Sequence, residues 1–198
     1  FLGPPGAFSA GNDLQDFMAF AMSGQMGSEV FDFLIALANS TKPLLAGVDG
    51  LAIGIGSTIH FHCDLTFATP QSLFKTPFVD LGLVPEAASS LLGPALMGAQ
   101  RAFAFLANGE GLTAAEAREA GLIYRIVEAA DLEETVLKAA ADIAAKPPEA
   151  MRITRDLLRM PREVVVERML LEAGHFRDRL QAEEARNTMV NFFSRKKA

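Results

Sequence analysis

The chain has few of the residues that mark several common functions. Cys63 is the only cysteine, so neither a disulfide within the chain nor a cysteine-based zinc site can form. This cysteine usage is typical of a reducing compartment, and we expect the protein to be cytoplasmic. Tryptophan is absent, no apolar run reaches membrane-spanning length, and no secretory signal is visible at the start. We therefore expect no membrane association.

Positive charge is also scarce. The 18 Lys and Arg residues against 24 Asp and Glu residues give a formal net charge of −6. This balance gives no reason to expect a nucleic-acid partner, because such binding is driven largely by basic residues that neutralise phosphates. The composition, 50% hydrophobic and 21% charged over 198 residues, is that of an ordinary globular domain.

Short apolar segments alternate with helical patterns early in the chain, and helical patterns dominate later. The spacing predicts strands over residues 44–48, 64–68, 72–75 and 122–127. It predicts helices over residues 13–22, 30–39, 56–62, 87–96, 99–107, 113–121, 131–145, 149–158 and 163–191. Residues 3–11 are rich in Gly and Pro and are predicted to be a loop. This order indicates the α/β class with a helical C-terminal layer.

Two glycine-rich corners could bind a developing negative charge. Asn12 follows a glycine where a loop enters a predicted helix, and Ile55 stands between two glycines where a strand turns into a helix. Small residues let the backbone approach a ligand closely, and the first N–H groups of a helix lack partners within it. Each corner by itself is equally compatible with a packing turn or a helix entry that binds nothing.

Glu86 is the candidate proton-transfer residue. It follows the apolar residues 81–85 (LGLVP) and precedes two alanines. A carboxyl group in apolar surroundings tends to have a raised pKa, which suits a general base near neutral pH. On spacing alone, an acid at a helix start that faces water is an equally good interpretation.

Other chemistries have weaker support. His60 and His62 are two residues apart and do not share a helix face, and only Asp64 lies near them, so we predict no metal site. Ser9 and Ser57 lack the Gly-x-Ser-x-Gly pattern of many serine hydrolases. No phosphate-binding Gly-x-x-x-x-Gly-Lys-Ser/Thr motif is present.

Several short segments follow one another in a recognisable order along nearly the whole chain. They are residues 7–13 (AFSAGND), 42–43 (KP), 50–54 (GLAIG), 63–65 (CDL), 76–78 (TPF), 81–85 (LGLVP) and 112–117 (LTAAEA). In this order and spacing they resemble the crotonase superfamily of enoyl-CoA hydratases and isomerases. The resemblance implies a spiral core of ββα repeats, here over residues 1–130, and a C-terminal helical region over 131–198 that builds homotrimers or dimers of trimers. The family's first strands and helix would precede Phe1, so we expect an N-terminal part to be missing.

The resemblance also implies a ligand and a site. The substrate would be an acyl-CoA thioester, and no separate cofactor is implied because coenzyme A is part of the substrate. The backbone N–H groups of Asn12 and Ile55 would form the oxyanion hole, with Glu86 as the catalytic base. Substrate-binding positions would be Ala10, Gly11, Gly54 and the apolar Leu14, Phe17, Phe78 and Leu83, although apolar residues at such spacing are more often plain core.

The reaction depends on where carboxylates stand. Hydratases of this family use two glutamates, at the positions occupied here by Thr58 and Phe78, and neither side chain can act as a base. Residues 85–90 (PEAASS) look like the corresponding stretch of the peroxisomal-type Δ3,Δ2-enoyl-CoA isomerases. A double-bond shift needs one base and no water. The alternatives are a hydratase or another crotonase reaction that uses Glu86 or Asp80 differently, and an acyl-CoA binder without activity.

The last predicted helix carries an apolar stripe, formed by Met169, Leu170, Phe176 and Leu180. We expect this C-terminal region to pack across a subunit boundary and to help close the acyl pocket.

Overall fold

The first five strands alternate between two small sheets, so this part of the chain winds through the core as a spiral. The computed structural model describes residues 1–23 and 28–195, without the side chains of residues 14, 21–23 and 192–195. One sheet has the order β1-β3-β5-β6, with bounds Ala7–Ser9, Leu51–Ile53, Leu73–Lys75 and Leu112–Thr113. The other has the order β2-β4-β7, with bounds Leu45–Val48, Leu65–Ala68 and Arg125–Ile126. All named pairs are parallel except β5 with β6.

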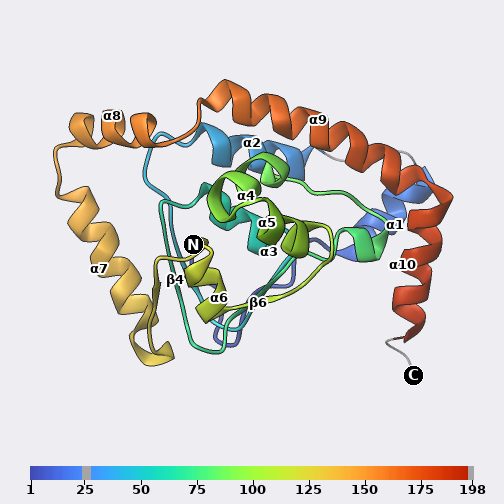
Figure 1. The fold of residues 1–198 in the computed structure, drawn as a ribbon, viewed down its shortest axis with the longest axis horizontal. Coiled ribbons are helices and arrows are strands. Elements are labelled where there is room, and N and C mark those ends of the chain that lie inside the picture. Colours follow the sequence, from blue (N-terminus) through green and yellow to red (C-terminus); the bar gives the residue numbers. More distant parts are fainter. Residues whose placement is uncertain (24–27, 196–198) are drawn as a thin grey trace.

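Helices cover these sheets and account for most of the second half of the chain (Figure 1). They are α1 Leu14–Ser23, α2 Glu29–Asn39, α3 Ile55–Thr58, α4 Ser89–Met97, α5 Ala99–Leu106, α6 Ala114–Glu119, α7 Leu132–Ala144, α8 Pro148–Leu158, α9 Arg162–Gln181 and α10 Glu183–Arg195. Short 3-10 helices occur at η1 Ile59–His62, η2 Val79–Leu81 and η3 Ala129–Asp131.

Local capping signals were good guides to where helices begin. The Asp13 carboxylate accepts a hydrogen bond from the Gln15 N–H at 2.8 Å at the start of α1. Thr113 and Glu116 form the reciprocal capping box that opens α6. Most predicted helices and strands are confirmed to within a few residues.

The structure differs from four predictions of local structure. The Gly- and Pro-rich loop contains β1, because its backbone pairs with β3. The helix predicted from residue 87 begins at Ser89, since Ala87 and Ala88 have positive φ. The strand expected over 122–127 is reduced to β7. The final long helix is interrupted at Ala182, whose backbone is extended, and so becomes α9 and α10.

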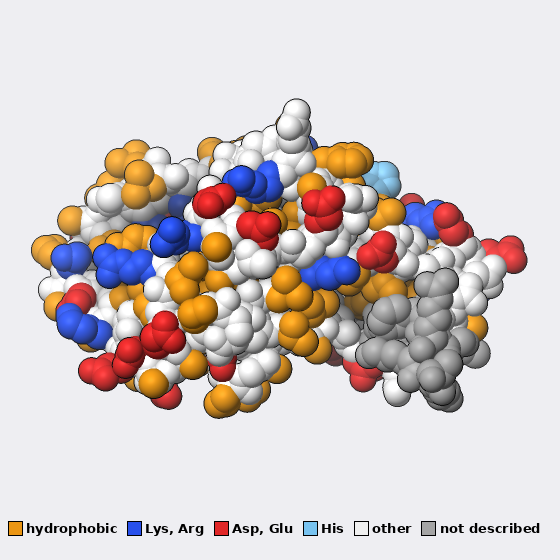
Figure 2. Space-filling model, turned by 60° about the horizontal axis from the view of Figure 1, so that its bottom comes forward, with side chains coloured by type: hydrophobic (Ala, Val, Ile, Leu, Met, Phe, Trp, Pro, Cys, Tyr) orange, Lys and Arg blue, Asp and Glu red, His pale blue; other side chains and the backbone are white. Residues whose placement is uncertain are grey.

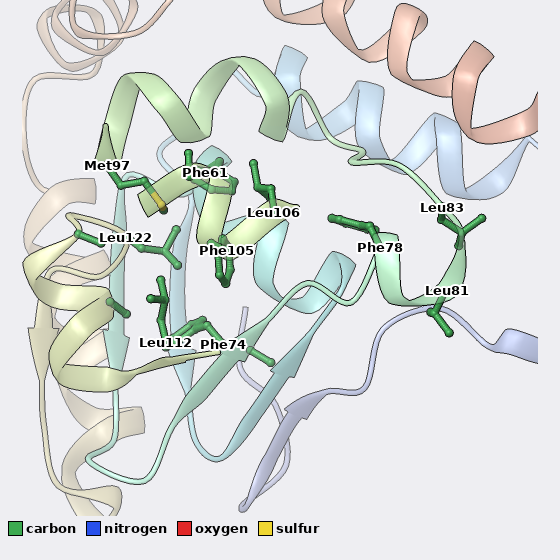
Figure 3. Close-up of a cluster of buried hydrophobic side chains, with 14 of the residues drawn as sticks. Phe61, Phe74, Phe78, Leu81, Leu83, Met97, Phe105, Leu106, Leu112 and Leu122 are labelled. Carbon is green, nitrogen blue, oxygen red and sulfur yellow. The ribbon is translucent and has the colours of Figure 1, made fainter. Parts of the chain in front are cut away.

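The main core joins the sheets to the C-terminal helices. Phe74, Phe105, Leu106 and Leu112 belong to it, as Figure 3 shows, together with Met97 of α4. Residues of α9 and α10 belong to the same cluster, among them Phe176, Leu180, Ala185 and Met189. The division into residues 1–130 and 131–198 stays a prediction, because side chains from both parts build one core.

The apolar stripe of α9 packs on its own chain. Met169, Phe176 and Leu180 are buried, whereas Leu170 is 56% exposed. In Figure 1, α9 runs across α2 and continues beside α1 into α10. These three side chains are therefore buried within their own chain, and α9 closes a cavity, as described below. Packing of the C-terminal region across a subunit boundary stays a prediction.

The surface of the described residues mixes side chains of every type. Figure 2 shows acidic and basic groups interleaved with hydrophobic ones on one face of the molecule. Among the described residues, no helix combines the length and the apolar character needed to cross a membrane.

Candidate active site

A cavity of about 320 Å³ lies between the turn before α4 and the helices α1, α2 and α9. Its lining is mostly apolar, with a few polar groups. The lining residues are Asn12, Phe17, Val30, Phe31, Leu34, Glu86, Ala87, Met169, Leu170, Glu172, Ala173, Gly174, Phe176 and Arg177. An apolar cavity of this size with a few polar side chains is typical of a small-molecule site.

Backbone packing brings the two predicted oxyanion corners together. Strand β1 pairs with β3, with Ser9 opposite Ala52. Gly11 has φ +86°, and a Cβ there would lie 2.8 Å from the Ile53 carbonyl oxygen, so only glycine lets the loop approach this closely. Asn12 therefore lies beside the end of β3, close to the point where α3 begins at Ile55.

The Ile55 corner has a conformation that requires glycine. Gly54 adopts φ 57° and ψ −121°, which places Ile55 at the first position of α3. The N–H groups of a first helical turn have no acceptor within the helix. The Ile55 N–H therefore has no acceptor within α3, and its part in an oxyanion hole stays a prediction.

Glu86 is buried, with 7% of its surface exposed, and lines the cavity. The Thr58 hydroxyl donates to Glu86 Oε1 at 3.0 Å. Burial raises the pKa of Glu86 from 4.5 to about 7; the Thr58 hydrogen bond lowers the pKa, and the charge of Glu172 raises it further. The alternative of a water-facing acid is thereby excluded.

Glu172 is a second buried carboxyl at the same cavity, and sequence reasoning missed it. Its Oε2 accepts the Ala88 N–H at 2.6 Å, and its Oε1 accepts the Ser90 N–H at 2.9 Å. Burial raises the pKa of Glu172, while the hydrogen bonds from Ser90 and Ala88 lower it. Its place in α9, far along the chain from Glu86, left no local signal by which it could have been found.

Three of the predicted site residues line the cavity together: Asn12, Phe17 and Glu86. Gly11, Gly54 and Ile55 lie in the adjoining corner, and Ala10 is exposed. The side chain of Leu14 lies outside the described residues.

Phe78 and Leu83 are not at the cavity. Both belong to the main core cluster, and in Figure 3 the Phe78 ring points toward the side of the cluster that holds Leu106. Neither is among the lining residues of this cavity that the structure describes, so their predicted part in binding the acyl chain stays a prediction. Asp80, the alternative acid, is exposed and is not among the lining residues that the structure describes.

His62, the second of the two histidines, makes a hydrogen bond inside the molecule. His62 is buried, and burial lowers its pKa to about 4, so the ring is neutral near pH 7. Its Nε2 lies 2.7 Å from the Ala87 carbonyl oxygen, which can only accept, so Nε2 carries the proton. Within the described residues, no group of three or more His, Cys, Asp or Glu side chains is placed to hold a metal ion.

Comparison with known proteins identifies the family. A family model described as enoyl-CoA hydratase/isomerase matches residues 2–198. The chain belongs to this family. The expected crotonase-type α/β core with a helical C-terminal region is thereby confirmed, in agreement with the alternation of β1 to β5 between two sheets.

The relatives that the chain resembles include proteins named as isomerases and proteins named as hydratases. The chain is 34% identical over 204 residues to enoyl-CoA delta isomerase 2 of Rattus norvegicus, covering 99% of this chain and 52% of that protein. It is 32% identical to the Homo sapiens protein of the same name, covering 96% of this chain and 50% of that one. It is 27% identical to 2,3-dehydroadipyl-CoA hydratase of Escherichia coli, covering 96% of this chain and 74% of that protein. The chain thus spans about half the length of the two isomerases.

A solved structure shows the same fold. The crystal structure of enoyl-CoA hydratase/isomerase from Pseudoalteromonas atlantica superposes with a TM-score of 0.88 at 36% identity. The match covers 95% of this chain and 75% of that one.

Proposed function

We propose that this chain converts 3-enoyl-CoA thioesters to 2-enoyl-CoA thioesters in fatty-acid or related acyl-CoA catabolism. The observation that carries the proposal is the buried Glu86 carboxyl, which lines an apolar cavity beside the Asn12 and Ile55 corner and has a pKa of about 7. A base with such a pKa can both take and return a proton near neutral pH.

The reaction needs one base and one place for negative charge. Glu86 removes a proton from C2, between the thioester carbonyl and the C3–C4 double bond. The electron pair moves into a dienolate, and the thioester oxygen becomes an oxyanion that the N–H groups of Asn12 and Ile55 stabilise. Such a donor is worth roughly 3–4 kcal/mol in other enzymes. Glu86 then returns the proton to C4, which leaves the double bond between C2 and C3.

Hydration is the less favoured reaction, because it needs a water held by two carboxylates. Thr58 stands at one hydratase position and donates to Glu86. Phe78 stands at the other and is buried in the core. Glu172 is a second carboxylate at the cavity, but both of its oxygens accept backbone N–H groups.

Within the described residues, Glu86 Oε1 has a partner in Thr58 and Oε2 has none, so Oε2 is the oxygen available to a substrate.

The proposal also includes assembly as homotrimers or dimers of trimers, which light scattering would test. The cytoplasmic location expected from the cysteine content stays a prediction.

The test is to incubate the protein separately with a 3-enoyl-CoA and a 2-enoyl-CoA and to identify the products by mass spectrometry and NMR. We expect the 3-enoyl thioester to become the 2-enoyl thioester without a change in mass. The control variant Asp80→Asn should match the wild type, because Asp80 is exposed. Addition of water to the 2-enoyl thioester at a comparable rate would replace this proposal with a hydratase. Tight binding without conversion would indicate a binder.

A further inference from the structure

Two consecutive alanines after Glu86 have a backbone conformation that alanine rarely adopts. Ala87 has φ 61° and Ala88 has φ 54°, and both side chains are buried. A non-glycine residue in the left-handed region persists only where its surroundings hold it there. This turn is therefore imposed by contacts from elsewhere in the molecule.

Contacts from three directions hold the turn. His62 donates to the Ala87 carbonyl oxygen at 2.7 Å. Within the turn, the Ser89 N–H and hydroxyl both donate to the Glu86 carbonyl oxygen. Glu172, from α9, accepts the Ala88 and Ser90 N–H groups at 2.6 and 2.9 Å. These N–H groups lie at the start of α4, where a carboxylate is favourable.

Glu172 is the contact that joins this turn to the cavity. It is buried, with 6% of its surface exposed, and lines the cavity along with Glu86. Because backbone N–H groups occupy both of its oxygens, it is not itself placed to exchange a proton with a substrate. Its carboxylate instead fixes the backbone that carries the Glu86 side chain.

We propose that Glu172 is a positioning residue for Glu86, which holds the strained Ala87–Ala88 turn so that the Glu86 carboxylate faces the cavity and which keeps a negative charge beside it. The inference rests on the proposed function for its kinetic consequence. Its structural part, the link between Glu172 and the state of Glu86, is independent of the reaction.

The charges around Glu86 are few. From α9, Glu172 and Arg177 line the cavity, and Arg168 donates to the Ser90 hydroxyl at 3.1 Å. From η1, His62 is neutral near pH 7. The lining residues that α1 and α2 contribute are apolar. The Glu172 charge is the one that raises the pKa of Glu86 in addition to burial, so its removal should lower that pKa.

The test compares Glu172→Gln with Glu172→Asp and with the control Glu167→Gln, which changes an exposed carboxyl on the same helix. The first readout is the titration of Glu86 by carbon-13 NMR of labelled glutamate carboxyls, assigned with Glu86→Gln. The second is kcat and KM for a 3-enoyl-CoA. Thermal denaturation follows folding in all variants.

We expect Glu172→Gln to lower the titration midpoint of Glu86, and Glu167→Gln to leave it in place. The kcat of Glu172→Gln should fall by about 10–100-fold with KM little changed, since a small misplacement of a reacting group can cost about 100-fold. Glu172→Asp keeps the charge but shortens the reach, so it should keep the midpoint close to that of the wild type and lose part of kcat. A role in stability alone would lower the melting temperature without moving the midpoint.

An unchanged midpoint in Glu172→Gln would overturn the inference, whatever the activity. A wild-type protein that does not isomerise, with a midpoint that still moves in Glu172→Gln, would overturn the proposed function and support the positioning role. If Glu172→Gln does not fold, the kcat of Glu172→Asp becomes the deciding measurement. A kcat equal to that of the wild type would overturn the inference, and a partial loss of kcat would support it.

Discussion

Glu86 is held between two opposing influences, and its chemistry depends on their balance. Burial favours its neutral form, and the Thr58 hydroxyl favours its ionised form. A threonine at the position where hydratases place a glutamate thus lowers the pKa of the proposed base. The result is a carboxyl group whose pKa of about 7 lies near the pH at which proton transfer is most useful.

The pH profile should follow the ionisation of Glu86. Because the base must be ionised to accept a proton, kcat/KM for a 3-enoyl-CoA should rise with pH and level off above about 7. Thr58→Val removes the hydrogen bond that lowers the pKa, so its profile should move to higher pH. A wild-type midpoint near 4.5, the ordinary value for glutamate, would contradict this prediction.

The same burial should reduce stability at high pH. The folded state binds the Glu86 proton more tightly than the unfolded chain, so its contribution to stability falls as pH rises from 4.5 to about 7. Glu86→Gln removes the titrating carboxyl group, and with it this pH-dependent loss of stability. Relative to the wild type, the variant should gain stability across that interval, by roughly 3 kcal/mol once the pH exceeds 7. Urea denaturation on both sides of the interval measures the gain, and a difference independent of pH would be inconsistent with a raised pKa.

At the scale of elements, helix α9 and the corner between β3 and α3 supply much of the proposed site. Helix α9 presents Met169, Glu172 and Phe176 to the cavity, at spacings that share one helix face. Phe176 also packs edge-on against Phe17 of α1, with ring centroids 5.5 Å apart. The corner between β3 and α3 adds a backbone donor. The cavity therefore depends on packing between elements far apart in sequence.

Substitutions of Ile55 test the corner. The proposed donor to the oxyanion is the Ile55 backbone N–H, and its side chain has no part in that role. Ile55→Val should keep near wild-type rates. Ile55→Pro removes the donor, and because proline is tolerated at the first helical position, α3 should survive. Its kcat should fall by about 10²–10³-fold. Circular dichroism checks the fold, and equal losses in two folded variants would count against the oxyanion role.

At the scale of the whole molecule, an ion cluster fastens the C-terminal helices to the sheets. Arg155 of α8 is 6% exposed and donates from Nε to both Asp64 oxygens, at 2.9 and 2.8 Å. Asp64 also accepts the Leu44 N–H at 2.7 Å beside β2. Arg159 adds a further ion pair at 3.3 Å.

Breaking this cluster should be costly. Asp64→Asn leaves the buried Arg155 cation without its counter-charge, and loss of one partner of a buried pair typically costs about 3–5 kcal/mol. The matched control Asp142→Asn breaks an exposed pair with Lys138, which should change stability far less. Equal melting temperatures for the two variants would show that the cluster does not hold the C-terminal helices.

Sequence reasoning succeeded where the signal was local. The Thr113 capping box, the Asp13 cap and the glycines beside Asn12 and Ile55 each encode their conformation within a few residues. It failed at Ala87, because alanine has no preference for positive φ and the turn is held by tertiary contacts. Glu172 was missed for the same reason, since it meets Ala88 across 84 residues of chain.

The central claim is that Glu86 moves the proton, and exchange with solvent deuterium tests it most directly. Wild-type protein with a bound 3-enoyl thioester in deuterium oxide should exchange the C2 proton, as observed by NMR, and isomerise the substrate. Glu86→Gln keeps the shape of the side chain and should lose both activities by at least about 10³-fold, with substrate affinity little changed. Exchange and isomerisation that survive in Glu86→Gln would contradict the account.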